Sequence, residues 1–233
     1  MNEILKVDGV KKNYRQVAAL KGVDFTVGAG RIVGLLGPNG SGKTTLIKII
    51  AGLLQADGGS VTVCGEPIGV NSKKMVAYLP DKSFLSEWMT VEKMLGYTAD
   101  FFEDFDRSRA ENMIEALQIP FKAQIKQLSK GTKEKLSLAI TMSRRAKLYV
   151  LDETIAGVDP AARDFVIQTI LANYSPESSV LISTHLIADV EPVLSDVLFI
   201  NKGEITLKST VDAIRDEEGR SVDSLFREVF RCY

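Results

Sequence analysis

The sequence predicts an α/β fold with a largely parallel sheet, an N-terminal antiparallel β-lobe and an inserted helical lobe. Short apolar, β-branched runs alternate with helical patterns along the 233 residues, which is typical of a largely parallel sheet flanked by helices. The first runs follow one another with short turns, which indicates an antiparallel lobe. Between about Phe84 and Arg145 no convincing strand pattern occurs, so this stretch is expected to be a helical insertion.

The candidate strands are nine short segments rich in Val, Ile and Leu. The last two are separated by the sequence NKGE (201–204), which suits a hairpin turn. The strands are expected at Ile4–Val7, Val23–Val27, Ile32–Leu36, Ser60–Val63, Val76–Leu79, Leu148–Leu151, Val180–Ser183, Val197–Asn201 and Glu204–Leu207.

The candidate helices are recognised by apolar spacing and by polar residues suited to capping a helix N-terminus. A first helix begins near Thr44 and carries Leu46, Ile49, Ile50 and Leu53. The others are expected at Val91–Phe102 after the cap Thr90, at Arg107–Leu117 after Asp106, after Ser129 with Leu136, Ile140 and Ser143 along one side, and as two short amphipathic helices from about Ser209, including Val222–Phe230.

The composition is that of a soluble globular protein. It is 45% hydrophobic and 25% charged with a formal net charge of −1, which gives no reason to expect a nucleic-acid partner. The apolar runs are too short to cross a bilayer, so any membrane role requires a partner. The charged N-terminus does not suit a signal peptide, and the two cysteines, Cys64 and Cys232, suggest no disulfide framework, which is consistent with the cytosol.

The segment LGPNGSGKTTL (36–46) follows an apolar run and matches the phosphate-binding pattern G-x-x-x-x-G-K-[ST]. Its glycines let backbone N–H groups turn inward around an anion, and the following helix adds the positive end of its dipole. Lys43 is expected to reach the β- and γ-phosphates, and the Thr44 hydroxyl to ligate Mg²⁺. The predicted nucleotide-binding residues are Tyr14, Gly37, Pro38, Asn39, Gly40, Ser41, Gly42, Lys43, Thr44 and Thr45.

A second strand, in LYVLDE (148–153), ends in two adjacent carboxylates. After a phosphate-binding loop, such a strand places Asp152 beside Mg²⁺. Glu153 then stands where a general base polarises an attacking water. Taken alone, the pair could equally be two solvated acids at the end of a strand.

Three further segments resemble the ATP-binding subunits of ABC transporters. They are LSKGTKEKLSLA (128–139), LYVLDETIAGVDP (148–160) and LISTHL (181–186), in that family's order and spacing. Leu128, Ser129 and Gly131 match the signature LSGGQ, and residues 152–160 match six of nine positions of DEPTSGLDP if Val158 is accepted for Leu. The resemblance implies ATP and Mg²⁺ as ligands, ATP hydrolysis as the reaction, and transport through a separate membrane permease.

The resemblance also implies a head-to-tail dimer with a second copy of the chain or a similar subunit. Ser129, Lys130 and Gly131 would then contact the γ-phosphate held by the partner, and Asp159 would lie at the seam between the subunits. The alternative for Ser129 is an ordinary helix cap, which contributes about 1 kcal/mol without any ligand.

Two further site residues are implied by position. His185 matches the family's switch histidine, which contacts the γ-phosphate and the attacking water; a lone structural histidine is the alternative. Tyr14 matches an aromatic residue that stacks on adenine, and a tyrosine on an edge strand is the alternative.

The chain departs from the family pattern at three positions. Asp81 stands where the family has a glutamine that ligates Mg²⁺ and senses the membrane partner. A carboxylate is a good ligand for Mg²⁺, although this side chain is one methylene shorter and lacks the amide donor. A turn cap after Pro80 is the alternative. In the signature, Lys130 replaces a glycine and Thr132 a glutamine.

A single ABC ATPase domain is therefore expected over residues 1–233. Residues 1–83 and 146–208 would form the nucleotide-binding core with its β-lobe, 84–145 the helical signature lobe, and 209–233 short C-terminal helices. Through the permease, the chain would lie peripherally on the inner face of the cell membrane. The altered signature and the lack of a large C-terminal domain favour an exporter or antibiotic-resistance system.

Two other functions are open to a chain with this phosphate-binding loop. A GTPase is disfavoured, because NKGE ends in glutamate and no GTPase pattern explains Ser129 or His185. A non-transport ABC ATPase in translation or DNA repair is the remaining alternative. Such proteins usually carry two cassettes or a long coiled coil, and this chain has one cassette and no sustained heptads.

Overall fold

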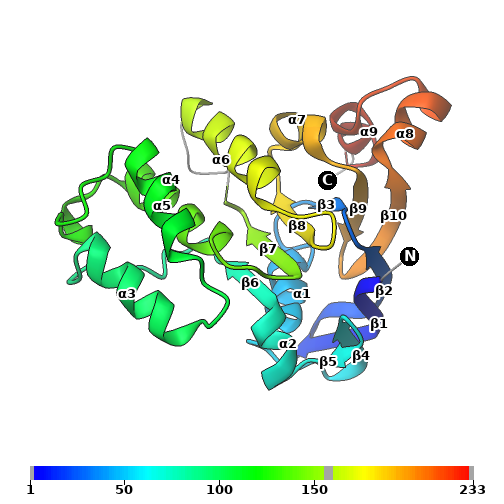
Figure 1. Ribbon diagram of the computed structural model, residues 1–233. Coiled ribbons are helices and arrows are strands. Elements are labelled where there is room, and N and C mark those ends of the chain that lie inside the picture. Colours follow the sequence, from blue (N-terminus) through cyan, green and yellow to red (C-terminus); the bar gives the residue numbers. More distant parts are fainter. Residues whose placement is uncertain (1–2, 155–159, 231–233) are drawn as a thin grey trace.

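The computed structural model describes residues 3–154 and 160–230, and it contains two sheets (Figure 1). The first is antiparallel, with strand order β2-β1-β4-β5. The second has the order β10-β9-β3-β8-β7-β6, and only β10 runs antiparallel to its neighbour. The α/β class and the antiparallel N-terminal lobe are therefore confirmed.

Apart from β5, the strands of the two sheets lie where the apolar runs predicted them, with some extensions. The antiparallel sheet consists of β1 (Glu3–Tyr14), β2 (Val17–Gly28), β4 (Gly58–Val63) and β5 (Glu66–Pro67). The larger sheet consists of β3 (Ile32–Leu36), β6 (Val76–Leu79), β7 (Leu148–Asp152), β8 (Ser179–Thr184), β9 (Asp196–Asn201) and β10 (Glu204–Thr210).

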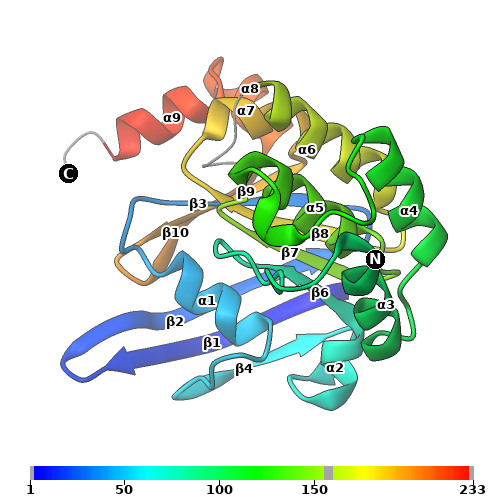
Figure 2. The same ribbon diagram turned by 90° about the vertical axis from the view of Figure 1, so that its left-hand side faces the viewer.

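Helix α1 (Lys43–Ile50) lies between the two sheets (Figure 2). Leu46, Ile47, Ile49 and Ile50 are all buried, because one side of the helix packs on the β-lobe and the other on the larger sheet. A helix that is apolar on more than one side is expected in such a sandwiched position. The packing holds the start of α1 firmly behind the carboxyl end of β3.

The opposite face of the larger sheet is covered by helices from the second half of the chain (Figure 1). They are α6 (Pro160–Asn173), α7 (Ile187–Val190), α8 (Val211–Glu218) and α9 (Val222–Val229), with a 3₁₀ turn at Glu191–Val193. Ile214 of α8 and Leu225 of α9 share one buried cluster with Phe199 of β9. The two predicted C-terminal helices are thus present and close the core.

The helical lobe comprises α3 (Val91–Phe101), α4 (Arg107–Ala116) and α5 (Lys130–Met142), with a 3₁₀ turn at Ile125–Gln127. It has a buried cluster of its own, and no strand occurs in the described chain between β6 and β7. The predicted N-caps are confirmed, because Thr90, Asp106 and Ser129 each accept a hydrogen bond from the backbone N–H three residues on.

Several local features differ from the sequence prediction. Helix α1 ends at Ile50 rather than continuing to Leu53, because Gly52 adopts a left-handed conformation (φ 68°) that terminates the helix, and Leu53 is 62% exposed. The short elements β5, α2 (Val70–Met75) and α7 were not predicted, because segments of two to six residues are too short to show a hydrophobic periodicity. Within the described ranges, no helix has the length and apolar character needed to span a membrane.

Candidate functional site

The glycine-rich loop leaves β3 and enters α1 with its backbone shaped by two glycines. Gly40 and Gly42 have φ values of 77° and 110°. A Cβ on Gly42 would lie 2.7 Å from the carbonyl oxygen of Ala19, so only glycine fits there. Unlike α3, α4 and α5, α1 has no side-chain cap at its N-terminus. Its first N–H groups therefore remain available for an anion.

Two buried side chains in this loop suit a phosphate. Ser41 is 2% exposed, and its Oγ has no hydrogen-bond partner in the described chain. Lys43 is 5% exposed, and its Nζ donates to the carbonyl oxygens of Gly37 (2.7 Å) and Pro38 (3.2 Å). Burial lowers the pKa of Lys43, which an anionic ligand would offset. An unpaired buried hydroxyl beside a buried ammonium fits a bound triphosphate.

The two carboxylates at the end of β7 occupy different environments. Asp152 is 1% exposed and accepts hydrogen bonds at Oδ1 from Ser183 Oγ (2.6 Å) and Thr44 Oγ1 (3.5 Å). Burial raises its pKa, and the hydrogen bonds from Ser183 and Thr44 oppose that shift. Glu153 Oε1 lies 3.7 Å from Lys43 Nζ, and Oε2 lies 2.9 Å from His185 Nδ1. Glu153 therefore stands between a lysine and the chain's one histidine.

A cavity of about 420 Å³ brings most of the predicted nucleotide-site residues together. Tyr14, 47% exposed, lies at its rim at the end of β1. The strand as a whole lies between β2 and β4, but its pairing with β4 ends at Lys11, so at Tyr14 only β2 is paired with it. The cavity is lined by Tyr14, Ala19, Asn39, Gly40, Ser41, Gly42, Lys43, Thr44, Thr45, Asp81, Glu153 and His185.

The oxygen atoms of Thr44, Asp81 and the adjoining Asp152 suit Mg²⁺. The Thr44 hydroxyl and the Asp152 carboxylate are in contact, and Asp81 lines the same cavity. Hydroxyl and carboxylate oxygens are the ligands that Mg²⁺ takes in proteins. The Asp81 carboxylate makes no hydrogen bond to the residues that the structure describes, so none of them shows a turn cap at this position.

The signature residues lie at the start of helix α5 in the helical lobe. Ser129 caps α5, and its Oγ accepts from the N–H of Thr132 (3.1 Å) and lies 2.8 Å from that residue's Oγ1. Lys130 has a side chain 80% exposed, near Glu134 (3.8 Å). Lys130 also lines a second cavity of about 320 Å³ that reaches Asp81 and Glu153. Ser129 and Gly131 are not among the described residues that line either cavity. Asp159 lies outside the described residues.

Sequence reasoning missed one side chain of the site. Ser183 in β8 is fully buried and contacts both Asp152 and the backbone of Glu153. The available signal was a serine next to the apolar run Val180–Ile182, two residues before His185. That signal is weak, because the pairing of β8 with β7 is not visible in the sequence.

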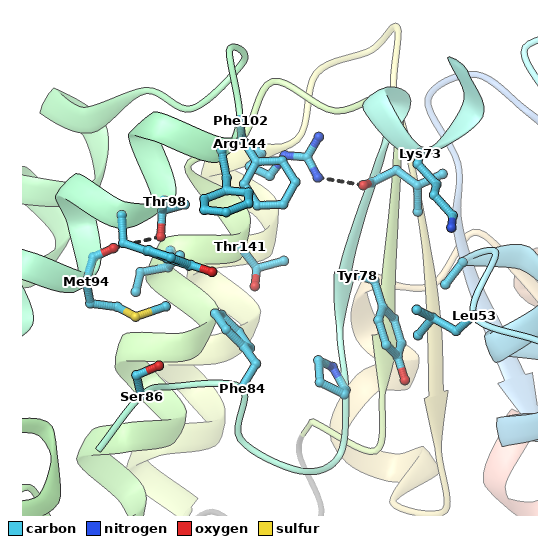
Figure 3. A pocket seen from close by; sticks show the side chains of 16 residues that line it. Leu53, Lys73, Tyr78, Phe84, Ser86, Met94, Thr98, Phe102, Thr141 and Arg144 are labelled. Atoms are coloured by element: carbon cyan, nitrogen blue, oxygen red, sulfur yellow. Dashed lines mark hydrogen bonds between the residues drawn. The ribbon is translucent and has the colours of Figure 1, made fainter. Parts of the chain in front are cut away.

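An apolar groove lies between the core and the helical lobe (Figure 3). It has a volume of about 550 Å³ and an aromatic lining. Leu53, Lys73 and Tyr78 of the core stand opposite Phe84, Met94 and Phe102. Five large hydrophobic residues of the groove are exposed: Leu53 (62%), Phe84 (38%), Tyr97 (44%), Phe101 (66%) and Phe102 (39%).

Comparisons with known proteins agree with this arrangement. Residues 20–156 match the family model described as ABC transporter. An uncharacterized ABC transporter ATP-binding protein of Synechocystis is 31% identical over 89% of this chain, and the chain spans 61% of that relative's length. The Nod factor export ATP-binding protein I of a Rhizobium species is 29% identical, with 90% of this chain and 71% of the relative aligned.

The fold also matches solved structures. One, described as the ATP binding subunit of an ABC transporter, has a TM-score of 0.85 at 26% identity and aligns over 97% of this chain and 99% of its own.

Proposed function

The chain belongs to the ABC transporter family of ATPases, and we propose that it binds and hydrolyses ATP to power transport through a separate membrane permease. One observation carries the catalytic half of this proposal: a single cavity holds the phosphate loop together with Glu153 and His185. Tyr14 at the rim would stack on the adenine. The loop amides, Ser41 and Lys43 would hold the phosphates.

In this mechanism Glu153 is the general base. Its carboxylate lies 3.7 Å from Lys43 of the phosphate loop, and His185 at 2.9 Å would hold its orientation. The base takes a proton from the attacking water, while Lys43 attracts the negative charge of the phosphates. Thr44, with Asp152 and Asp81 beside it, would hold Mg²⁺. The bound ion would neutralise part of the negative charge of the phosphates.

The apolar groove supports a helical segment of a membrane permease as the partner. Exposed aromatic patches of this kind mark interaction surfaces. An amphipathic helix laying its apolar face into such a groove is a recurrent binding mode. The groove also lies beside the loop that contains Asp81, since Pro80 and Phe84 line it. A helix docked there would contact the segment that lines the nucleotide cavity, on the inner face of the cell membrane.

The similarity to a protein named for Nod factor export favours export as the direction of transport. The alternative is a non-transport ABC ATPase acting in translation or DNA repair. That alternative requires no membrane-embedded partner, and so the two functions differ in one measurable property.

Replacing Tyr97 by Glu is expected to release the protein from membranes, because it places a charge among the groove's aromatic side chains. The ring of Tyr97 lies 4.6 Å from that of Phe101. A tagged protein expressed in its native host should sediment with membranes and retain a multi-span protein after detergent extraction. We expect the Tyr97→Glu variant to lose at least about 90% of this association, about 1.4 kcal/mol, and to keep its isolated ATPase rate.

The matched control is Leu171→Glu, an exposed apolar position (42%) on α6 outside the groove. It should remain membrane-associated. An unaltered protein that co-purifies only with soluble partners, or a Tyr97→Glu variant that stays bound, would contradict the proposed docking of a permease.

Replacing Asp81 by Ala is expected to make ATP affinity less dependent on Mg²⁺ than in the unaltered protein. The carboxylate adds negative charge beside the triphosphate, so the two groups repel each other unless Mg²⁺ is bound between them. Asp81→Gln, which restores the family's residue, should keep Mg²⁺-dependent turnover. Titration of ATP with and without Mg²⁺ measures both effects. Identical Mg²⁺ dependence in the three proteins would leave Asp81 as a turn residue.

A further inference from the structure

Ser183 connects the two acidic residues of the site through one hydroxyl group. It lies on β8 directly opposite Asp152 of β7 in the parallel register. Its Oγ donates to Asp152 Oδ1 at 2.6 Å and accepts from the N–H of Glu153 at 3.2 Å. A serine hydroxyl has one donor, so donation to Asp152 fixes its direction. At 0% exposure, no bulk water competes for these bonds.

Glu153 adopts a backbone conformation that non-glycine residues rarely take. Its φ is 52°, in the left-handed region. Its N–H is shared between the carbonyl oxygen (3.0 Å) and the Oγ (3.2 Å) of Ser183. Strained residues of this kind persist where their surroundings hold them, and they gather at functional sites. The same backbone turn directs the Glu153 side chain toward Lys43 and His185.

Asp152 is held with one oxygen engaged. Ser183 and Thr44 both donate to Oδ1, and Oδ2 makes no hydrogen bond to the residues described by the structure. Loss of the Ser183 hydroxyl would free the carboxylate to rotate and would leave the longer 3.5 Å contact with Thr44 as its restraint.

We propose that Ser183 is a positioning residue for ATP hydrolysis, which orients Asp152 toward the metal side of the site and holds Glu153 in its left-handed conformation. This inference rests on the proposed function. Groups that orient residues beside a metal in this way typically change metal affinity or activity by about 10- to 100-fold when removed.

The test compares Ser183→Ala with Ser179→Ala. Both serines lie on β8 and are fully buried, but the Ser179 hydroxyl donates to the carbonyl oxygen of Gly28 (2.7 Å), away from the site. Ser183→Ala should lower kcat by about 10- to 100-fold with a smaller change in KM for ATP. It should also reduce, by about 10-fold, the gain in equilibrium ATP affinity on adding Mg²⁺. Ser179→Ala should change neither, whatever its effect on melting temperature.

Ser183→Thr keeps the hydroxyl and is expected to recover most of the lost kcat. Two results would overturn the proposal: kcat and Mg²⁺ dependence in Ser183→Ala within twofold of the unaltered protein, or equal losses in Ser183→Ala and Ser179→Ala that follow the melting temperature. If the unaltered protein binds ATP without turning it over, the proposed function fails. The Mg²⁺ titrations then still decide whether Ser183 positions Asp152.

Discussion

Glu153→Gln should abolish ATP turnover while ATP binding is retained. The substitution keeps the size of the side chain and removes the carboxylate that lies next to both Lys43 and His185. Without a base to accept the proton of the attacking water, kcat should fall by about 10²- to 10⁴-fold. Phosphate release measured under saturating ATP gives this rate.

ATP affinity in the same variant should be equal to or tighter than that of the unaltered protein. Removing a negative charge 3.7 Å from Lys43 leaves the lysine free to face the phosphates and removes a repulsive partner of the triphosphate. Equilibrium binding of ATP, together with the fraction of dimer on gel filtration with ATP, tests this. An ATP-bound dimer should accumulate.

The control for Glu153 is Glu177→Gln. Glu177 pairs at 3.0 Å with Lys147, the residue just before β7, whereas Glu153 is the residue just after β7. Both changes therefore remove a carboxylate that pairs with a lysine, and each pair lies near one end of β7. Glu177→Gln should leave kcat unchanged within twofold. A hydrolysis rate that is also unchanged in Glu153→Gln would remove Glu153 from the role of general base.

Mixing Lys43→Ala with Ser129→Arg should restore activity that neither protein has alone. The described lining of the nucleotide cavity does not include Ser129, so a second chain is proposed to supply it. Lys43→Ala removes the buried ammonium from the phosphate loop, and Ser129→Arg places a bulky side chain at the start of α5. Each homodimer would then have two defective sites.

A mixed dimer has one site with neither defect and one with both. With random exchange of subunits in a two-fold dimer, about a quarter of all sites are intact, which sets the ceiling for recovered activity. A mixture as inactive as its parents would mean that each site is built within one chain, with Lys130 reaching it through the adjoining cavity.

The concentration dependence of turnover gives an independent measure of the same dimer. The specific activity of the unaltered protein should rise with protein concentration in the dilute range if, as proposed, only paired chains hydrolyse ATP. Constant specific activity down to concentrations where sedimentation shows a monomer would argue against a shared site.

Much of the fold was determined by local features of the sequence. The glycine-rich segment from Gly37 to Thr45 directly follows an apolar strand and leads into a helix. The whole pattern is therefore contiguous in the sequence, and it predicts the loop conformation without any distant contact. The caps Thr90, Asp106 and Ser129 bond to N–H groups three residues away, so their signals are equally local. Buried strands such as β3 and β7 are continuous apolar runs, because both faces of a parallel sheet are covered.

What the sequence alone could not decide was which distant segments meet. The contact of Ser183 with Asp152 depends on the order and register of β7 and β8, strands separated by helix α6. Asp81 and Glu153 share a cavity only because β6 pairs with β7. The aromatic groove likewise assembles side chains from α2, α3 and α5. Such contacts arise from strand order and helix packing, which depend on the burial of apolar surface across the whole chain rather than on any local pattern.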